Sequence, residues 1–393
     1  PRGGRAGGRR LARNPLMTSD IPAAIERSRT HGGNIWAAMR QSGLPPDRIV
    51  DFSVDLNPLG PPPCIRSIIE RHIEDLQRYP DPEAQALREA IAAFHRVAPD
   101  TILPGNGAAE LIGLLARFRP IAKAVMVVPP FSEYAWAGEH SGAAVVVEEV
   151  VADEDHQFEI EMSAKTWGEK LAGADVVFLC NPNNPTGAVV RRDAVLRLAE
   201  WCRQAGALFV VDEAFVDFTE HPEQVSILPD ALQEDHVVVL RSLTKSFAVP
   251  GLRLGYLAAH EALVRALRAL QPPWPLNTFA LAVGEQLVKE TAYLQQSRCM
   301  TARWREEFQR LLQALPVLTA FPSHTNFLLC RLQTAQRTSA DLARRLAAQG
   351  LLIRTCDDFR GLEPGRFIRL AVRTPEDNAR LVHALREVLT DAG

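Results

Sequence analysis

The sequence predicts an α/β protein whose larger domain holds a mostly parallel sheet with helices on both faces, followed by a smaller α+β domain. Strand-like apolar runs at 124–128, 143–151, 175–180 and 207–211 are separated by helical or polar stretches, and such alternation is typical of parallel strands. Polar residues follow the ends of several runs, where open α/β sheets bind ligands. A chain of 393 residues is also long enough for two domains.

Periodicity and turn residues predict the remaining elements. A short strand begins near Asp51 and runs into a proline-rich turn. Further strands are expected at 236–240, 317–320, 325–330, 351–354 and 367–372. Helices are expected at 35–41, 65–77, 83–95, 131–140, 191–204, 261–270, 341–349 and 374–391, with an apolar helix that ends at 118 and a long helical region that ends near 315.

The order of these elements predicts the domain boundaries. Residues 76–279 are expected to form the larger domain and residues 280–393 the smaller one, which the segment 31–75 joins. Residues 1–16 contain five arginines and no acid, and such a composition cannot bury apolar surface. We therefore expect residues 1–30 to be a disordered basic extension, with Met17 as a plausible true start.

Composition narrows the class of protein. A hydrophobic content of 47% and a charged content of 23% are ordinary for a globular protein, and a net charge of −3 argues against general nucleic-acid affinity. No apolar run approaches the length of a membrane span. The six cysteines show no Cys-x-x-Cys spacing, so neither a metal site nor a disulfide framework is expected. A reducing cytoplasm fits this pattern.

One lysine lies among hydroxyl residues directly after an apolar run. Lys245 follows the run 236–240, and Ser242, Thr244 and Arg253 are close to it in the sequence. A lysine amine can condense with an aldehyde cofactor, and pyridoxal phosphate (PLP) is the commonest example. Hydroxyl groups and a guanidinium supply donors and positive charge for a phosphate. Since a lysine in a turn is more often a surface residue, this interpretation needs support from elsewhere in the chain.

Other residues meet the remaining chemical demands of PLP. Glycines before the apolar helix allow the backbone of Gly107 and Ala108 to approach an anion. Asp212 ends an apolar run and can keep the pyridine nitrogen protonated, so that the ring accepts electrons. Asn184 can donate to the phenolate oxygen of the ring, and Tyr134 can stack on the ring face.

Three motifs together resemble the fold-type I PLP enzymes of the class I/II aminotransferase family, over roughly residues 31–390. Their joint occurrence in this order is very specific. The motifs are Asn-Pro-x-Asn-Pro-Thr-Gly at 181–187, Asp-Glu-Ala-Phe at 212–215, and Ser-x-Thr-Lys-Ser-Phe at 242–247 with Gly-Leu-Arg-x-Gly at 251–255.

The resemblance implies a homodimer with active sites at the subunit interface. In the family, the tyrosine that matches Tyr79 reaches the cofactor phosphate of the neighbouring subunit. Arg369 matches the arginine that clamps the substrate carboxylate with two hydrogen bonds. Arg354 matches a second substrate-facing arginine in the members that use phosphorylated substrates.

Two branches of the family are most similar to this chain: histidinol-phosphate aminotransferase and the threonine-phosphate decarboxylase of cobalamin biosynthesis. His-Gly-Gly-Asn at 31–34 and the segment 51–60 resemble the opening of the decarboxylase, in which His31 would help to bind the substrate phosphate. The aminotransferase branch usually carries tyrosine at the position of Phe215. The resemblance therefore implies decarboxylation of L-threonine O-3-phosphate to (R)-1-amino-2-propanol phosphate and carbon dioxide, with transamination of histidinol phosphate or a related amino acid as the alternative.

The sequence departs from the decarboxylase pattern at Asp55, where the family usually has asparagine near the substrate phosphate. A carboxylate repels a phosphate unless an arginine intervenes or the carboxylate is protonated. Asp55 therefore either faces the substrate, which favours a related amino-acid phosphate or an unphosphorylated substrate, or turns away and binds the backbone. The same residues support both reactions, because decarboxylation and transamination differ in the orientation of the substrate about Cα.

Overall fold

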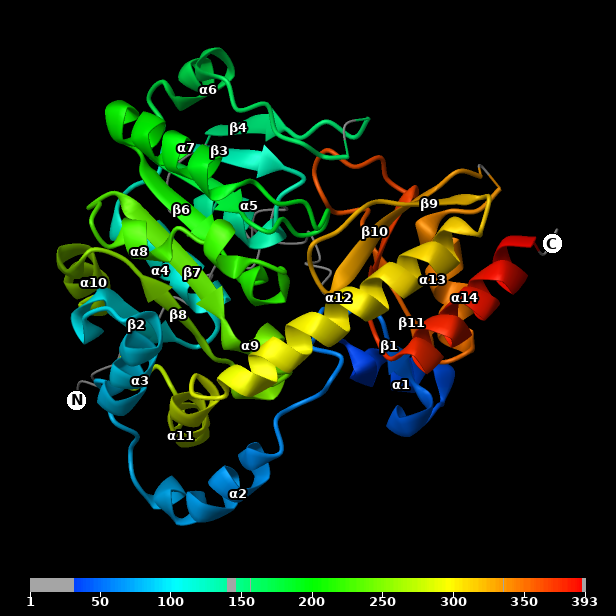
Figure 1. Cartoon of the computed structure of the whole chain (residues 1–393), viewed down its shortest axis with the longest axis horizontal. Helices are drawn as coiled ribbons and strands as arrows, with labels where there is room; N and C mark the ends of the chain where they lie inside the picture. The colour runs from blue at the N-terminus through cyan, green and yellow to red at the C-terminus, as the bar shows by residue number, and fades with distance from the viewer. Residues whose placement is uncertain (1–31, 140–145, 156, 335, 391–393) are drawn as a thin grey trace, which may run out of the picture. The chain divides into compact units, whose positions relative to one another are not determined.

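A seven-stranded mixed sheet lies at the centre of the larger part of the chain (Figure 1). This computed structural model describes residues 32–139, 146–155, 157–334 and 336–390. The strand order is β2-β8-β7-β6-β5-β3-β4, and β8 alone runs against the others in this sheet, so the expected mostly parallel sheet is confirmed. The strands are β2 (Ile102–Gly105), β3 (Lys123–Val128), β4 (Val146–Val151), β5 (Val176–Cys180), β6 (Leu208–Asp212), β7 (Val237–Ser242) and β8 (Gly255–Ala258).

Two strands of this sheet, β2 and β8, were not predicted. Each has only four residues, and β2 contains Pro104, which usually argues against a strand. The proline is tolerated because β2 is the edge strand and pairs only with β8 in this sheet. The pairing nevertheless matters for function, since it aligns Gly105 with Gly255.

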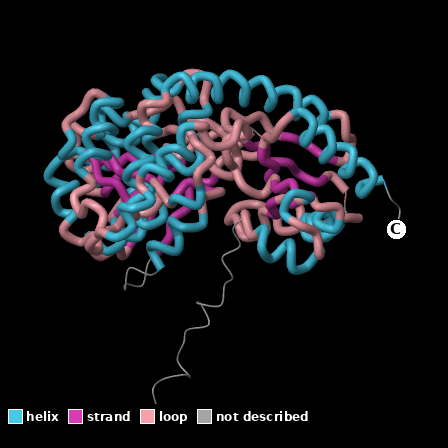
Figure 2. Tube along the Cα trace, turned by 90° about the horizontal axis from the view of Figure 1, so that it is seen from below, coloured by secondary structure: helices cyan, strands magenta, loops and turns pink. Residues whose placement is uncertain are grey.

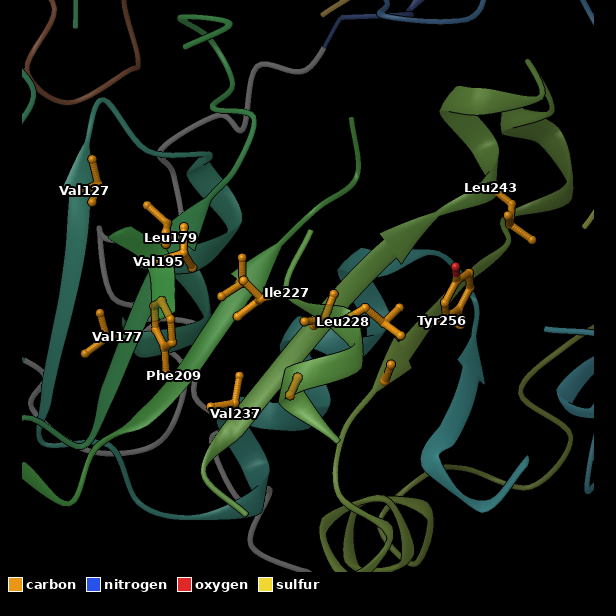
Figure 3. Close-up of a cluster of buried hydrophobic side chains, with 14 of the residues drawn as sticks. Val127, Val177, Leu179, Val195, Phe209, Ile227, Leu228, Val237, Leu243 and Tyr256 are labelled. Carbon is orange, nitrogen blue, oxygen red and sulfur yellow. The ribbon is translucent and has the colours of Figure 1, made fainter. Parts of the chain in front are cut away.

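Helices cover both faces of the sheet, and alternating side chains bury against them. Val125 and Val127 on β3 belong to one buried cluster, and Ala124 and Met126 to another. Figure 3 shows part of the first cluster, with strand residues such as Phe209 packed near helix residues. Helices α3 (Gln85–His95), α6 (Ala164–Leu171), α7 (Arg192–Ala205), α8 (Leu228–Ala231) and α11 (Thr278–Leu287) contribute to the first cluster, and α4 (Ala108–Phe118), α5 (Ser132–Glu139) and α10 (Glu261–Arg268) to the second.

A separate four-stranded antiparallel sheet lies in the C-terminal part, again flanked by helices (Figure 2). Its order is β12-β13-β10-β9, and it packs with three helices around a third buried cluster. The expected strand at 351–354 is divided into two two-residue strands that join different sheets. The elements are β9 (Leu318–Ala320), β10 (Phe327–Leu332), β11 (Leu351–Leu352), β12 (Arg354–Thr355), β13 (Phe367–Ala371), α12 (Thr291–Gln313), α13 (Ser339–Ala348) and α14 (Pro375–Thr390).

The segment that begins the described chain pairs with this C-terminal part. Strand β1 (Val50–Asp51) lies parallel to β11, and the Phe52 carbonyl accepts a hydrogen bond from the Ala371 N–H. The helices of this segment are α1 (Ile35–Ser42) and α2 (Cys64–Arg71). Residues 32–393 form one compact unit, and the expected boundary near residue 280 stays a prediction. The expected basic extension at 1–30 lies outside the described residues.

No helix among the described residues combines the length and the apolar character that crossing a membrane requires.

Candidate active site

Three parallel neighbouring strands bring the predicted motifs together at the carboxyl ends of the strands of the larger sheet. The register aligns Cys180 with Asp212 and Asp212 with Leu240, so β5 and β6 end at the same level and β7 continues for two residues beyond it. The motif at 181–187 follows β5, Asp212 ends β6, and Lys245 lies on the short helix α9 (Leu243–Ser246) directly after β7. The structure therefore brings together residues that are far apart in the sequence, at the carboxyl ends of the strands, where such sheets bind ligands.

Two glycines allow neighbouring segments to pack closely beside the start of α4. Gly255 lies between Gly105 and Ser242 in the sheet, and a Cβ added to it would lie 2.9 Å from the Ala108 nitrogen and 2.8 Å from the Arg241 carbonyl oxygen. Real Cβ atoms do not approach backbone so closely, so only glycine allows this packing.

The second glycine, Gly107, has a φ of +79° and precedes the N-terminus of α4. A Cβ at this position would lie 2.8 Å from Nη2 of Arg253. On the adjacent strand end, the Ser242 and Thr244 hydroxyl oxygens are 2.6 Å apart. The helix N-terminus, the hydroxyls and the guanidinium thus form a cradle of donors with the chemistry that a phosphate requires.

Asp212 presents a buried carboxylate at the end of β6. Its Oδ2 accepts a hydrogen bond of 2.7 Å from the Tyr134 hydroxyl, and its Oδ1 accepts one of 3.0 Å from the Ala214 N–H. Burial raises the pKa of Asp212, whereas these two hydrogen bonds and Lys245 act in the opposite direction. A positively charged ring nitrogen placed against this carboxylate would stabilise its ionised form in the same way.

Tyr134 makes a contact that sequence reasoning missed. Besides donating to Asp212, its ring stacks on Phe178, with centroids 5.0 Å apart and ring planes 6° apart. Burial, reinforced by the neighbouring Asp212, raises the pKa of Tyr134 well above its usual value, so its hydroxyl stays a donor. Its role as the residue that covers a ring stays a prediction. The sequence contains no signal that relates position 134 to position 212.

Lys245 is partly buried in this site. Burial lowers the pKa of its amine, while Asp55 acts to raise it and Arg369 acts to lower it. Its Nζ lies 5.9 Å from the centroid of the Phe215 ring. A lowered pKa increases the fraction of neutral amine, which is the nucleophilic form that attacks an aldehyde.

A buried network that the sequence did not reveal holds the helix of Lys245. The Ser246 hydroxyl donates to Asp217 at 2.6 Å, and Arg241 forms ion pairs with Glu213 at 2.9 Å and with Asp217 at 3.2 Å. From the other side, the Asn57 N–H donates to the Lys245 carbonyl. These contacts fix the backbone around the amine, which is the usual function of residues that surround a reactive group.

Arg369 lies within the site on β13 and is bound to three residues. Its Nη1 donates to the amide oxygen of Asn184, which leaves the Asn184 nitrogen as a donor. Its Nη2 donates to the Ser53 carbonyl at 3.1 Å and lies 2.9 Å from Oδ1 of Asp55. Asp55 therefore forms an ion pair with an arginine and accepts no backbone hydrogen bond from the described residues.

Arg354 lies directly opposite Arg369 on the neighbouring strand β12. Its Nη2 contacts both carboxylate oxygens of Asp358, at 2.8 and 2.7 Å, and its guanidinium lies 5.1 Å from the Phe359 ring centroid. Both arginines predicted to bind substrate are thus paired with carboxylates of the chain itself.

Among the described residues, one predicted site residue is not brought together with the others. Tyr79 is 79% exposed and stacks on Trp274, with ring centroids 4.4 Å apart, so it is available to another molecule. His31 lies outside the described residues.

Comparison with known proteins identifies the family. The family described as aminotransferase class I and II matches residues 47–385. Threonine-phosphate decarboxylase of Salmonella typhimurium is 38% identical, over 92% of this chain and 96% of its own length. Histidinol-phosphate aminotransferase of Methanopyrus kandleri is 31% identical, over 89% of this chain and 90% of its own.

A solved structure has the same fold. Histidinol-phosphate aminotransferase of Sinorhizobium meliloti, in complex with pyridoxal-5'-phosphate, superimposes with a TM-score of 0.83 at 22% identity, over 96% of this chain and all of the other.

The residues of this site fit PLP. Gly107 and Gly255 let the start of α4 lie close to the Arg253 guanidinium and to the end of β7. The buried Asp212 carboxylate can pair with a cationic ring nitrogen, and a lysine of lowered pKa lies in the same site. Lys245 would hold the aldehyde carbon, Asp212 the ring nitrogen and Asn184 the phenolate oxygen. The chain therefore belongs to the aminotransferase class I and II family and is a PLP-dependent enzyme.

Proposed function

We propose that this enzyme decarboxylates L-threonine O-3-phosphate to (R)-1-amino-2-propanol phosphate and carbon dioxide, a step of cobalamin biosynthesis. The observation that supports this reaction most is the 38% identity to a threonine-phosphate decarboxylase across almost the whole of both chains. Phe215 supports the same branch, because its ring cannot donate a hydrogen bond to the phenolate oxygen of the cofactor. That donation then falls to Asn184, whose amide oxygen already accepts from Arg369.

Different side chains of the site bind the substrate, stabilise charge and transfer a proton. Bound PLP supplies an electron-accepting ring. Arg369 would hold the substrate carboxylate and so orient the bond between Cα and the carboxylate for cleavage. Asp212 stabilises positive charge at the ring nitrogen. Lys245 or a water molecule then delivers a proton to Cα.

Transamination is the second candidate, and a specific observation favours it. Histidinol-phosphate aminotransferase of Methanopyrus kandleri is 31% identical over most of both chains. In that reaction the Cα–H bond would stand perpendicular to the ring, and Lys245 would carry the proton away from Cα.

The deciding experiment incubates the PLP-loaded protein with L-threonine O-3-phosphate in the absence of any keto-acid. We expect catalytic release of carbon dioxide and aminopropanol phosphate, with none from the Lys245→Ala variant. Absence of release, together with amino transfer from histidinol phosphate to 2-oxoglutarate, would refute the decarboxylase and support the second candidate.

We also propose that the enzyme is a homodimer that works in the cytoplasm without nucleic-acid partners. Four exposed apolar side chains support a subunit interface: Ile73, Leu76, Tyr79 and Trp274. Six unpaired cysteines support a reducing compartment, and the net charge of −3 is unlike that of a general nucleic-acid binder.

A further inference from the structure

Asp55 is a charged group inside the site with no other assigned function. Its side chain is buried, with 2% exposure, and Arg369 is 5% exposed. The Asp55 Oδ1 and Arg369 Nη2 atoms are 2.9 Å apart, but the contact lacks hydrogen-bond geometry. Among the described residues, Oδ1 accepts no hydrogen bond at all. The carboxylate therefore faces the guanidinium mainly as a counter-charge.

Only some of the N–H groups of the Arg369 guanidinium are free to bind a substrate. Its Nη1 is bound to Asn184, its Nη2 is shared between Ser53 and Asp55, and its Nε has no partner among the described residues. A substrate carboxylate that binds this guanidinium must therefore lie next to the Asp55 carboxylate. Two like charges in a buried site repel strongly, because little water is present to screen them.

We propose that Asp55 sets how strongly the enzyme holds the substrate carboxylate, and that it promotes loss of that carboxylate. As the resident counter-ion of Arg369, it weakens carboxylate binding in the ground state. The inference rests on the proposed function in one respect: the substrate carboxylate binds at Arg369.

The reaction removes the repulsion. The bond between Cα and the carboxylate would break and the carboxylate would leave as neutral carbon dioxide, while bound PLP would supply the group that accepts the electron pair of that bond. A proton from Lys245 or water later forms the new bond at Cα. Because negative charge next to Asp55 decreases along this path, the repulsion is smaller in the transition state than in the ground state. A repulsion that is stronger in the ground state than in the transition state raises kcat and also raises KM.

Asp55→Asn tests the inference because asparagine preserves shape and removes charge. For L-threonine O-3-phosphate, the variant should show a KM at least about tenfold lower together with a lower kcat. A merely structural role would raise KM or lower kcat without tightening binding. Asp358→Asn is the matched control, because it removes the partner of the neighbouring Arg354 and leaves the Asp55–Arg369 pair intact.

Binding of unreactive probes supplies a readout that is independent of turnover. (R)-3-phosphonooxybutanoate contains the carboxylate and the phosphate of the substrate but no amine, and isopropyl phosphate lacks only the carboxylate of that probe. Calorimetry on the PLP-loaded proteins gives the ratio of their two Kd values. Asp55→Asn should change this ratio at least about tenfold in favour of the carboxylate-bearing probe, while Asp358→Asn leaves the ratio unchanged.

The outcomes separate this inference from the proposed function. If wild-type protein fails to decarboxylate L-threonine O-3-phosphate but the Kd ratio changes as expected, the function is wrong and the role of Asp55 in carboxylate binding stands. An unchanged ratio in Asp55→Asn overturns the inference even if the enzyme is a decarboxylase. A changed ratio with an undiminished kcat overturns the part of the inference that concerns catalysis.

Discussion

At the scale of single residues, the site depends on how neighbours alter the charge of buried groups. Lys245 illustrates this, because burial lowers the pKa of its amine while the negative charge of Asp55 acts to raise it. Below its pKa the amine is protonated and cannot attack an aldehyde, so capture of PLP must accelerate as pH rises through that pKa.

We therefore predict that Asp55→Asn captures PLP faster at neutral pH. Loss of the carboxylate lowers the pKa of Lys245 further, so the rise in the capture rate moves to lower pH. Absorbance changes after mixing PLP-free protein with PLP, recorded across a pH series, measure this. Identical pH profiles for the variant and the wild type would contradict the assigned coupling. Asp358→Asn again serves as the control.

A second prediction concerns the hydrogen bond from Tyr134 to Asp212. Tyr134→Phe removes one donor to a buried carboxylate and keeps the ring that stacks on Phe178. A hydrogen bond to a charged group contributes about 1.5–3 kcal/mol, so PLP should bind roughly tenfold or more weakly. Equilibrium dialysis of PLP measures the change, and a Kd equal to that of the wild type would show that the bond does not support Asp212.

The sequence predicts those features of the site that depend on neighbouring residues, and it does not predict contacts between distant segments. Asp212 and Lys245 each follow an apolar run directly, so their places at strand ends were accessible from the sequence. The pairing of Arg369 with Asp55 joins a strand to a loop that is remote in sequence, and no local pattern specifies it. Tyr134 was assigned to a ring face from its residue type, whereas its hydroxyl contact depends on the packing of α5 against the sheet.

At the scale of elements, the same distinction separates the expected strands from the missed ones. The interior strands β5, β6 and β7 are continuous apolar runs because both of their faces are covered by helices. Strands β2 and β8 are short and contain glycine or proline, and Gly255 of β8 packs against the backbone at the start of α4. Function thus weakened the sequence signal of the strands that form the phosphate cradle.

This explanation predicts the effect of filling one glycine of the cradle. In Gly255→Ala, the new methyl group would press on the Ala108 nitrogen and the Arg241 carbonyl, and overpacking of this kind costs about 1–3 kcal/mol. We expect a lower Tm and weaker PLP binding, measured by thermal unfolding with and without PLP. Gly113→Ala on α4 is the control, because its methyl group would meet nothing within 4 Å. Equal behaviour of the two variants would argue against a close-packed cradle.

At the scale of the whole molecule, the proposed homodimer would place Ile73, Leu76, Tyr79 and Trp274 in its subunit interface. We predict that Leu76→Asp, at a side chain that is 59% exposed, weakens the homodimer and lowers activity along with it. Light scattering after size exclusion gives the molar mass. Val151→Asp, at an equally apolar and exposed position on the edge strand β4, should remain dimeric. If the Leu76→Asp protein had the same molar mass in solution as the wild type, the interface would have to lie elsewhere.

The pairing of β1 with β11 has a consequence for synthesis of the protein. The segment that contains Phe52 and Asp55 leaves the ribosome long before β11 and Ala371, which hold it, have been synthesised. N-terminal regions generally fold first during synthesis, yet this segment must wait for its partners. The Asp55–Arg369 pair therefore cannot form until residue 369 has been synthesised, and a polypeptide arrested before that residue lacks the counter-charge of Asp55.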